Sequence, residues 1–197
     1  MQAVLTGDII NSQSNNKWQK VLVSVLNTYG TEPEQWEIYR GDSFQLEVEA
    51  QKGLEAAIHI KATLKTFSNL DVRIAIGLGE KNYESKKVTQ ANGSAFVHSG
   101  TAFDSIKKNT LVIQSENTDF DKILNLMLSL ATLTMDVWPP VTASIIKKQL
   151  EQPLLNQTEL SEVLGKSQSA ISKALNRAGY SEITRLLNYY SETLKTL

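Results

Sequence analysis

The sequence contains no cysteine and only two histidines, His59 and His98. The absence of cysteine excludes disulfides, thiolate nucleophiles and Cys-ligated zinc, and it suits a reducing compartment. The two histidines have no partners at metal-ligand spacing, so packing or surface roles are favoured for both. The N-terminus also lacks the basic start, long apolar stretch and cleavage site of a signal peptide. These absences together predict a cytoplasmic protein.

An excess of charge of one sign and long apolar runs are also missing. The net charge is −1, so no overall electrostatic attraction to nucleic acid or membrane is expected. The most apolar stretch, residues 120–138, contains Asp, Lys, Asn, Ser and Thr and falls short of the ~20 apolar residues of a membrane span. We therefore expect a buried helix there and no membrane partner. The chain of 197 residues is long enough for one large domain or two small ones.

Hydrophobic periodicity in the first half alternates between strand and helix patterns. Strands are expected at 3–10, over the two arms of 36–48, at 71–79 and at 110–115, and helices at 17–29, 53–67 and 95–107. The order β-α-β-β-α-β is the ferredoxin-like pattern, an antiparallel sheet with helices on one face, followed here by a further helix and strand. The predicted fold class is therefore α+β, with a ferredoxin-like domain over residues 1–117.

Two Gly-Asp pairs fall at corresponding places in this topology. Asp8 ends the first strand in LTGDIIN, and Asp42 lies at the hairpin tip in YRGDSFQ. Either pair alone is commonly a turn. Together they favour a divalent cation such as Mg²⁺ or Mn²⁺, which uses one or two carboxylates plus phosphate oxygens of a nucleotide. Lys86 and Lys87, in the polar loop 80–94, are weaker candidates for contacting those phosphates, and a solvated loop is the alternative.

The strand ending in GDI, the RGDSF hairpin and the later RIAIGLGE strand resemble the palm domain of class III nucleotidyl cyclases, with GGDEF enzymes as more distant relatives. The resemblance implies a cyclase-like palm in which Asp8 and Asp42 bind metal and Asn92 orients the nucleotide. The following GSAFVHSGTAFD lacks the arginine that cyclases place there, and their base-selecting residues have no clear counterpart. This departure leaves two alternatives open. The palm binds nucleotide and metal without turning the nucleotide over, or it has lost both binding and turnover.

The second half reads as helix from residue 119 onward, interrupted by a Trp-Pro-Pro break at 138–140. Its strongest motif is NQTELSEVLGKSQSAISKALNRAGY, residues 156–180, which has the helix lengths and glycine turn of a helix-turn-helix. The first helix is expected at 157–164 and the second from 168 to about 178. The inward side chains would be Leu160, Val163, Leu164, Ile171, Ala174 and Leu175, with Gly165 at the turn. An all-helical domain over 118–197 is the resulting prediction.

The second of these helices would present a polar face to DNA. Glutamine and asparagine read adenine edges, lysine and arginine read guanine or hold phosphate, and serine adapts to either. A helical protein-interaction domain is the alternative to DNA binding. The candidate DNA-binding residues are the helix cap Ser167 together with Gln168, Ser169, Ser172, Lys173, Asn176 and Arg177.

The last helix, expected at 181–196, has apolar residues spaced alternately by four and three, the seam of a short coiled coil. As the seam of a homodimer it would present two recognition helices to a two-fold DNA site, and alternatively it closes the core of its own domain. The seam residues are Ile183, Leu187, Tyr190, Leu194 and Leu197.

Taken over nearly its full length, the chain resembles the SatD family of bacterial proteins. The features that carry the resemblance are the GDI start, RGDSFQ, ANGSAFVHSGTAFD, and TELSEVLGKSQSAISKAL after the Trp-Pro break. The family is usually described as regulatory. The combined hypothesis is a cytoplasmic DNA-binding regulator whose palm senses a nucleotide or metal, coupled through the helix at 120–137. The alternatives are a divergent metal-dependent nucleotidyl cyclase or nucleotidyltransferase, and a degenerate palm that serves as a dimerisation scaffold.

Overall fold

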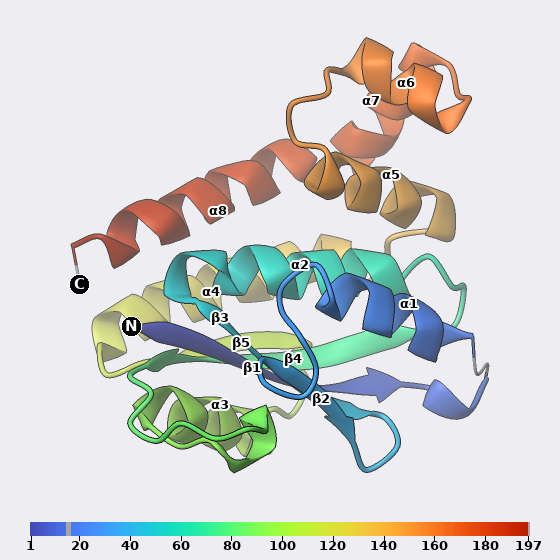
Figure 1. Ribbon diagram of the computed structural model, residues 1–197. Coiled ribbons are helices and arrows are strands. Elements are labelled where there is room, and N and C mark those ends of the chain that lie inside the picture. The colour runs from blue at the N-terminus through green and yellow to red at the C-terminus, as the bar shows by residue number, and fades with distance from the viewer. Residues whose placement is uncertain (15–16, 197) are drawn as a thin grey trace.

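The computed structural model describes residues 1–14 and 17–196, and the described part is a mixed α+β fold with one five-stranded sheet (Figure 1). The predicted α+β class is therefore confirmed. The first half contains β1 (Gln2–Ile10), α1 (Trp18–Leu26), β2 (Trp36–Tyr39), β3 (Ser43–Glu49), α2 (Gly53–Leu64), β4 (Asp71–Gly79), α3 (Ser94–Ser105) and β5 (Leu111–Gln114). The second half contains α4 (Thr118–Met135), α5 (Pro140–Glu151), α6 (Gln157–Leu164), α7 (Gln168–Arg177) and α8 (Tyr180–Leu194).

The strand order across the sheet is β2-β3-β1-β4-β5. The central strand β1 pairs antiparallel with both β3 and β4, and β2 pairs antiparallel with β3. The edge strand β5 runs parallel to β4, so the expectation of a purely antiparallel sheet is wrong at this edge. The reason is the intervening helix α3, which carries the chain back across the sheet as parallel pairing requires.

Helices cover both faces of the sheet, which corrects the expectation that they lie on one face. In Figure 1, α1 and α2 lie above the sheet and α3 lies below it. Successive side chains of a strand point to opposite faces. In β1, Ala3 and Leu5 join the main core, whereas Val4 packs with Ala95 and Phe96 of α3 in a second, smaller cluster. A strand buried on both faces is apolar at consecutive positions, as β1 is.

The helix α3 approaches the sheet closely because β4 carries a glycine beneath it. A Cβ atom built on Gly77 would lie 2.2 Å from the carbonyl oxygen of Ala95 and 2.2 Å from the amide nitrogen of Ser99. The buried Ser99 hydroxyl also donates a hydrogen bond of 2.7 Å to Oγ1 of Thr6 in β1. Backbone contact and a buried polar pair thus fix α3 on this face.

The two halves of the chain share one hydrophobic core. The helix α5 packs on α2, and α4 packs along β5, where the Asn125 amide bonds both the backbone N–H and the carbonyl of Ile113. These bonds occupy backbone groups that the edge strand would otherwise expose. The Tyr190 hydroxyl of α8 donates a 2.6 Å hydrogen bond to the carbonyl of Ala50, in the short 3-10 helix Ala50–Lys52 that precedes α2.

The helix α8 uses its apolar row within its own chain. Ile183, Tyr190 and Leu194 are buried and Leu187 is half-buried, while Leu197 lies outside the described residues. The row therefore closes the core, which was the alternative to a free dimer seam. Among the described helices, α4 included, none has the length and apolar character needed to cross a membrane.

Candidate functional site

Asp8 and Asp42 line one cavity of about 820 Å³ at an end of the sheet. The strand β1 ends there, and the β2–β3 hairpin places its tip beside it, since the backbone N–H of Ile9 donates to the Asp42 carbonyl at 3.1 Å. The topology therefore brings the two predicted metal ligands together. We call this the carboxylate cavity; its lining residues are Asp8, Ile9, Ile10, Asn11, Ser12, Gln13, Asp42, Asn69 and Arg73.

The Asp8 carboxylate is paired with Arg73, which sequence reasoning did not single out. The two residues are cross-strand partners in β1 and β4. The Arg73 Nε atom donates to Oδ1 of Asp8 at 2.9 Å, and its Nη2 atom donates to Oδ2. This hydrogen bonding raises the pKa of the Arg73 guanidinium. The signal that reveals the pair is the strand register, which places position 73 opposite position 8.

The Asp42 carboxylate follows a tight hairpin tip. Arg40 and Gly41 both have positive φ, 52° and 91°, so the chain reverses over three residues between Tyr39 and Ser43. Glycine adopts this backbone without steric cost, whereas arginine does so with strain. Oδ2 of Asp42 accepts a 2.7 Å hydrogen bond from the Ser12 hydroxyl. The tip therefore both turns the chain and fixes Asp42 beside the end of β1.

As arranged, the cavity does not present two unengaged carboxylates to a cation. Both oxygens of Asp8 accept hydrogen bonds from Arg73, and one oxygen of Asp42 accepts from Ser12. Within residues 1–14 and 17–196 no group of three or more His, Asp or Glu side chains has the geometry to hold a metal ion. The cavity also contains the Arg73 guanidinium, a group whose planar donors match carboxylate and phosphate oxygens and which is here engaged by Asp8.

The three weaker nucleotide candidates lie elsewhere. Lys87 pairs with Glu37 of β2 at 2.8 Å, and Lys86 is exposed on the same loop. The Asn92 Oδ1 atom accepts a 2.8 Å hydrogen bond from the N–H of Gly93, directly before α3. None of these three side chains lines the carboxylate cavity as the structure describes it. The structure therefore brings the two aspartates together but not the remaining candidates.

The segment predicted as a helix-turn-helix forms two short helices joined by a three-residue turn. The bounds of α6 match the expected helix, and α7 ends one residue before its expected end. Asn156 caps α6 in a reciprocal capping box with Glu159, and Gly165 ends the helix at φ 59°. Ser167 caps α7 by accepting from the N–H of Ala170 at 3.2 Å. These caps satisfy backbone groups that a helix leaves unpaired at its ends.

The inward residues of this segment agree with expectation at most positions. Leu160, Ile171 and Leu175 are buried. Val163 was expected to point inward but is 54% exposed, which corrects that prediction. The physical reason is that α6 is a two-turn helix packed on one side only, so Leu160 and its neighbour Ser161 occupy the inward row.

The polar face of α7 is open to solvent. The helix is buried only through Ile171 and Leu175, and it packs against α5, α6 and α8. Figure 1 shows α6 and α7 at the top of the molecule, separated from the sheet by α5 and α8. Ser172 is half-buried, and the other candidate residues are exposed: Ser167, Gln168, Ser169, Lys173, Asn176 and Arg177.

Comparison with known proteins gives a family. No curated protein and no solved structure matches the chain. The model of the SatD family matches residues 3–188, which include β1 apart from its first residue, β2 to β5, helices α1 to α7 and most of α8. The chain therefore belongs to the SatD family.

Proposed function

We propose that this protein is a DNA-binding regulator that presents the exposed face of α7 to the major groove. The observation that carries the proposal is that the polar side chains of α7 are exposed, on a helix that lies at the top of the molecule (Figure 1). Gln168 and Ser169 lie in the first turn, where a recognition helix meets base edges. Lys173 and Arg177 follow on the exposed surface, where they would hold phosphates or read guanine.

A route between the two halves supports regulation. The helix α4 packs on β5 of the sheet, and the chain that follows it carries Trp138. The buried indole Nε1 of Trp138 donates a 3.2 Å hydrogen bond to the carbonyl of Ala178, directly after α7. A change in the sheet domain that moves α4 would therefore reach the end of the proposed recognition helix.

The test is binding of the full chain to a labelled pool of duplex DNA, followed by fluorescence anisotropy over a series of salt concentrations. Lys173→Ala and Arg177→Ala should each weaken binding and reduce the slope of log affinity against log salt by about 1. Lys122→Ala is the matched control, because Lys122 is an exposed lysine on α4. Wild-type affinity in both α7 variants would reject α7 as the DNA-binding face.

The second candidate function is binding of a nucleotide with a divalent cation in the carboxylate cavity. The favouring observation is that Asp8, Asp42 and Arg73 line one cavity. Mg²⁺ or Mn²⁺ would be held by the two aspartates, and Arg73 would pair with a phosphate in place of Asp8. The cation would supply neutralisation of phosphate charge. A protein that binds the nucleotide without turnover would act as a sensor. One that also turns it over would be a cyclase or nucleotidyltransferase.

Thermal unfolding with ATP, GTP or cyclic nucleotides, each with Mg²⁺ or Mn²⁺, tests this second candidate. A ligand at a hundred times its dissociation constant stabilises by ~2.7 kcal/mol, which raises Tm by roughly 5–10 °C for a chain of this size. Asp42→Asn should remove the increase, whereas Asp119→Asn, an exposed aspartate on α4, should keep it. Metal-dependent consumption of a triphosphate would favour the enzyme. No shift with any ligand would favour a scaffold.

A further inference from the structure

The helix α4 carries two apolar rows, and only one of them is covered. Phe120, Leu124 and Leu128 are buried against the core. A second row lies on the solvent side and contains Ile123, Leu126, Leu130 and Leu133 of α4 together with Val137, two residues past the end of the helix; we call this row the α4 stripe. A helix that is apolar on both sides is normally buried on both sides. The stripe is therefore a surface that needs a partner.

The spacing of the stripe identifies the kind of partner. The four stripe residues within α4 follow one another at intervals of three, four and three, which is the spacing that packs one α-helix against another. Val137 follows four residues later, just after the helix ends. Leu130 and Leu133, near the middle of the stripe, are 60% and 72% exposed. Leucine is a common knob residue where two helices pack on each other. The partner surface that fits this row is another apolar helix.

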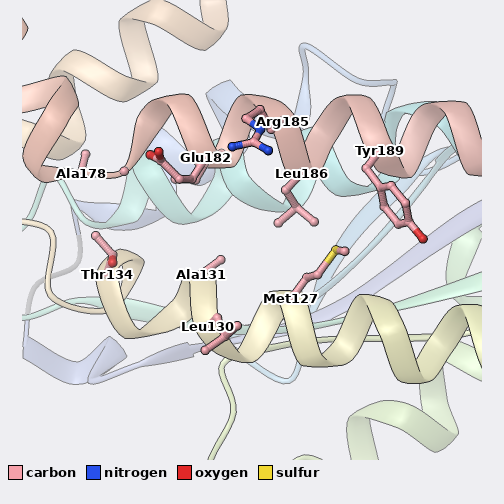
Figure 2. Close-up of a pocket in the computed structure, with 11 residues that line it drawn as sticks. Met127, Leu130, Ala131, Thr134, Ala178, Glu182, Arg185, Leu186 and Tyr189 are labelled. Carbon is pink, nitrogen blue, oxygen red and sulfur yellow. The ribbon is translucent and has the colours of Figure 1, made fainter.

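A groove beside the stripe would receive side chains of such a helix. It has a volume of about 490 Å³ and lies between α4 and α8. Leu130 forms its edge, and Figure 2 shows Met127 of α4 opposite Leu186 and Tyr189 of α8. The groove thus extends the apolar surface of the stripe toward α8.

The size of the surface fits a dimer. The five stripe residues are between 45% and 72% exposed, which makes the stripe comparable to the largest apolar patch of a typical monomer, about 300–600 Å². Two such patches facing each other would bury an area comparable to the ~1,000 Å² expected of a biological interface. The groove would add to this area.

The charges around the stripe argue against lipid as the partner. Helices that lie on a membrane surface carry Lys and Arg beside their apolar row. Within α4 the only basic residue is Lys122, and the acidic residues Asp119 and Asp121 lie in the same turn. A second copy of the chain supplies the same stripe and needs no basic flank.

We propose that the α4 stripe is the interface of a homodimer, in which the stripes of two copies pack on each other about a two-fold axis. A two-fold interface is self-complementary, so one row of residues suffices for both copies. The proposal does not depend on DNA binding. If α7 does bind DNA, the dimer presents two copies of α7 to a two-fold site.

The test is the molecular mass of the full chain in solution without DNA, measured by light scattering after size-exclusion chromatography over a dilution series. The wild type should have twice the chain mass of 21.9 kDa. The double variant Leu126→Glu/Leu133→Glu should have the mass of one chain. Both side chains are exposed, so the change should leave the monomer folded, which circular dichroism verifies. Leu154→Glu is the matched control, because Leu154 is 96% exposed and lies outside the stripe.

Two results would overturn the proposal. One is a wild type with the mass of one chain at the highest concentration, and the other is a double variant that remains dimeric. A monomeric wild type that co-sediments with phosphatidylcholine vesicles would assign the stripe to lipid instead. A dimer in the wild type and in Leu154→Glu, but not in the double variant, would establish the interface whether or not the protein binds DNA.

Discussion

Asp8 and Arg73, 65 residues apart in the sequence, are cross-strand partners joined by two hydrogen bonds from the guanidinium to the carboxylate. The pair joins the central strand β1 to its neighbour β4, and both side chains line the carboxylate cavity. Each side chain fixes the position of the other, so the charge that the cavity presents depends on both.

The first prediction is that these two residues are energetically coupled. Arg73→Ala and Asp8→Ala should each lower the free energy of unfolding. In the double variant this loss should be smaller than the sum of the two single losses by about 1 kcal/mol. The coupling is expected to be of this modest size because the pair is partly exposed. Urea unfolding of the wild type and the three variants gives the coupling. The more exposed pair of Asp119 and Lys122 serves as the comparison and should show weaker coupling. Additive single effects would show that the pair is not coupled.

The second prediction concerns the close contact between α3 and the sheet. Gly77→Ala should lower the free energy of unfolding by about 1–3 kcal/mol or more, because the added methyl group meets the α3 backbone. Gly100→Ala, within α3, should instead stabilise by about 0.5–1 kcal/mol, because an added Cβ there meets no atom within 4 Å and alanine favours the helix. Chemical denaturation measures both. A well-tolerated Gly77→Ala would mean that α3 can move away from β4.

The third prediction is a pH dependence of stability from His59. Its Nδ1 atom bonds the Tyr29 hydroxyl at 2.9 Å, and its Nε2 atom is buried 3.7 Å from Oε1 of Glu151 without a hydrogen-bond partner. Burial lowers the pKa of His59 from its ordinary value of 6.5. The unfolded chain therefore takes up this proton at a higher pH than the folded chain, so stability falls as the pH drops through about 6.5.

Urea unfolding from about pH 7.5 to about pH 5.5 measures this effect. His59→Gln should flatten the pH dependence in this window, because glutamine keeps a hydrogen-bonding group toward Tyr29 but does not titrate. His98→Gln should keep the wild-type dependence, since His59 is still present. An unchanged slope in His59→Gln would assign the dependence to other groups.

The fourth prediction separates base reading from phosphate contact on α7. Gln168 lies exposed in the first turn, where base edges would be met, so Gln168→Ala should change the preferred sequence more than the affinity for pooled DNA. Arg177→Ala, in the last turn, should weaken binding to all sequences together if this arginine holds phosphate. Selection of bound duplexes from a random pool, followed by sequencing, compares the two variants. The same selected sequence in Gln168→Ala and the wild type would exclude base reading at that position.

The sequence determined the local elements of this protein. The strand at 71–79 and the helix at 157–164 were predicted at their observed bounds. Strand alternation and the turn glycine Gly165 are properties of neighbouring residues, so they can be read along the chain. The meeting of Asp8 and Asp42 also followed, because strand order alone places the end of β1 beside the hairpin tip.

The tertiary structure decided which neighbouring element covers each apolar face of a helix or strand and which residue pairs with each charged side chain. The apolar pattern of α3 does not say which face of the sheet this helix covers. That face is evident only from the close contact between the α3 backbone and Gly77 of β4. The apolar row of α8 is compatible with a second chain or with its own core, and the hydrogen bond from Tyr190 to Ala50 fixes it within the chain. Arg73 becomes part of the carboxylate cavity only through the register of β4 on β1. Hydrophobic periodicity indicates that one face of a helix or strand is apolar. Which element buries that face is set by contacts between residues distant in sequence.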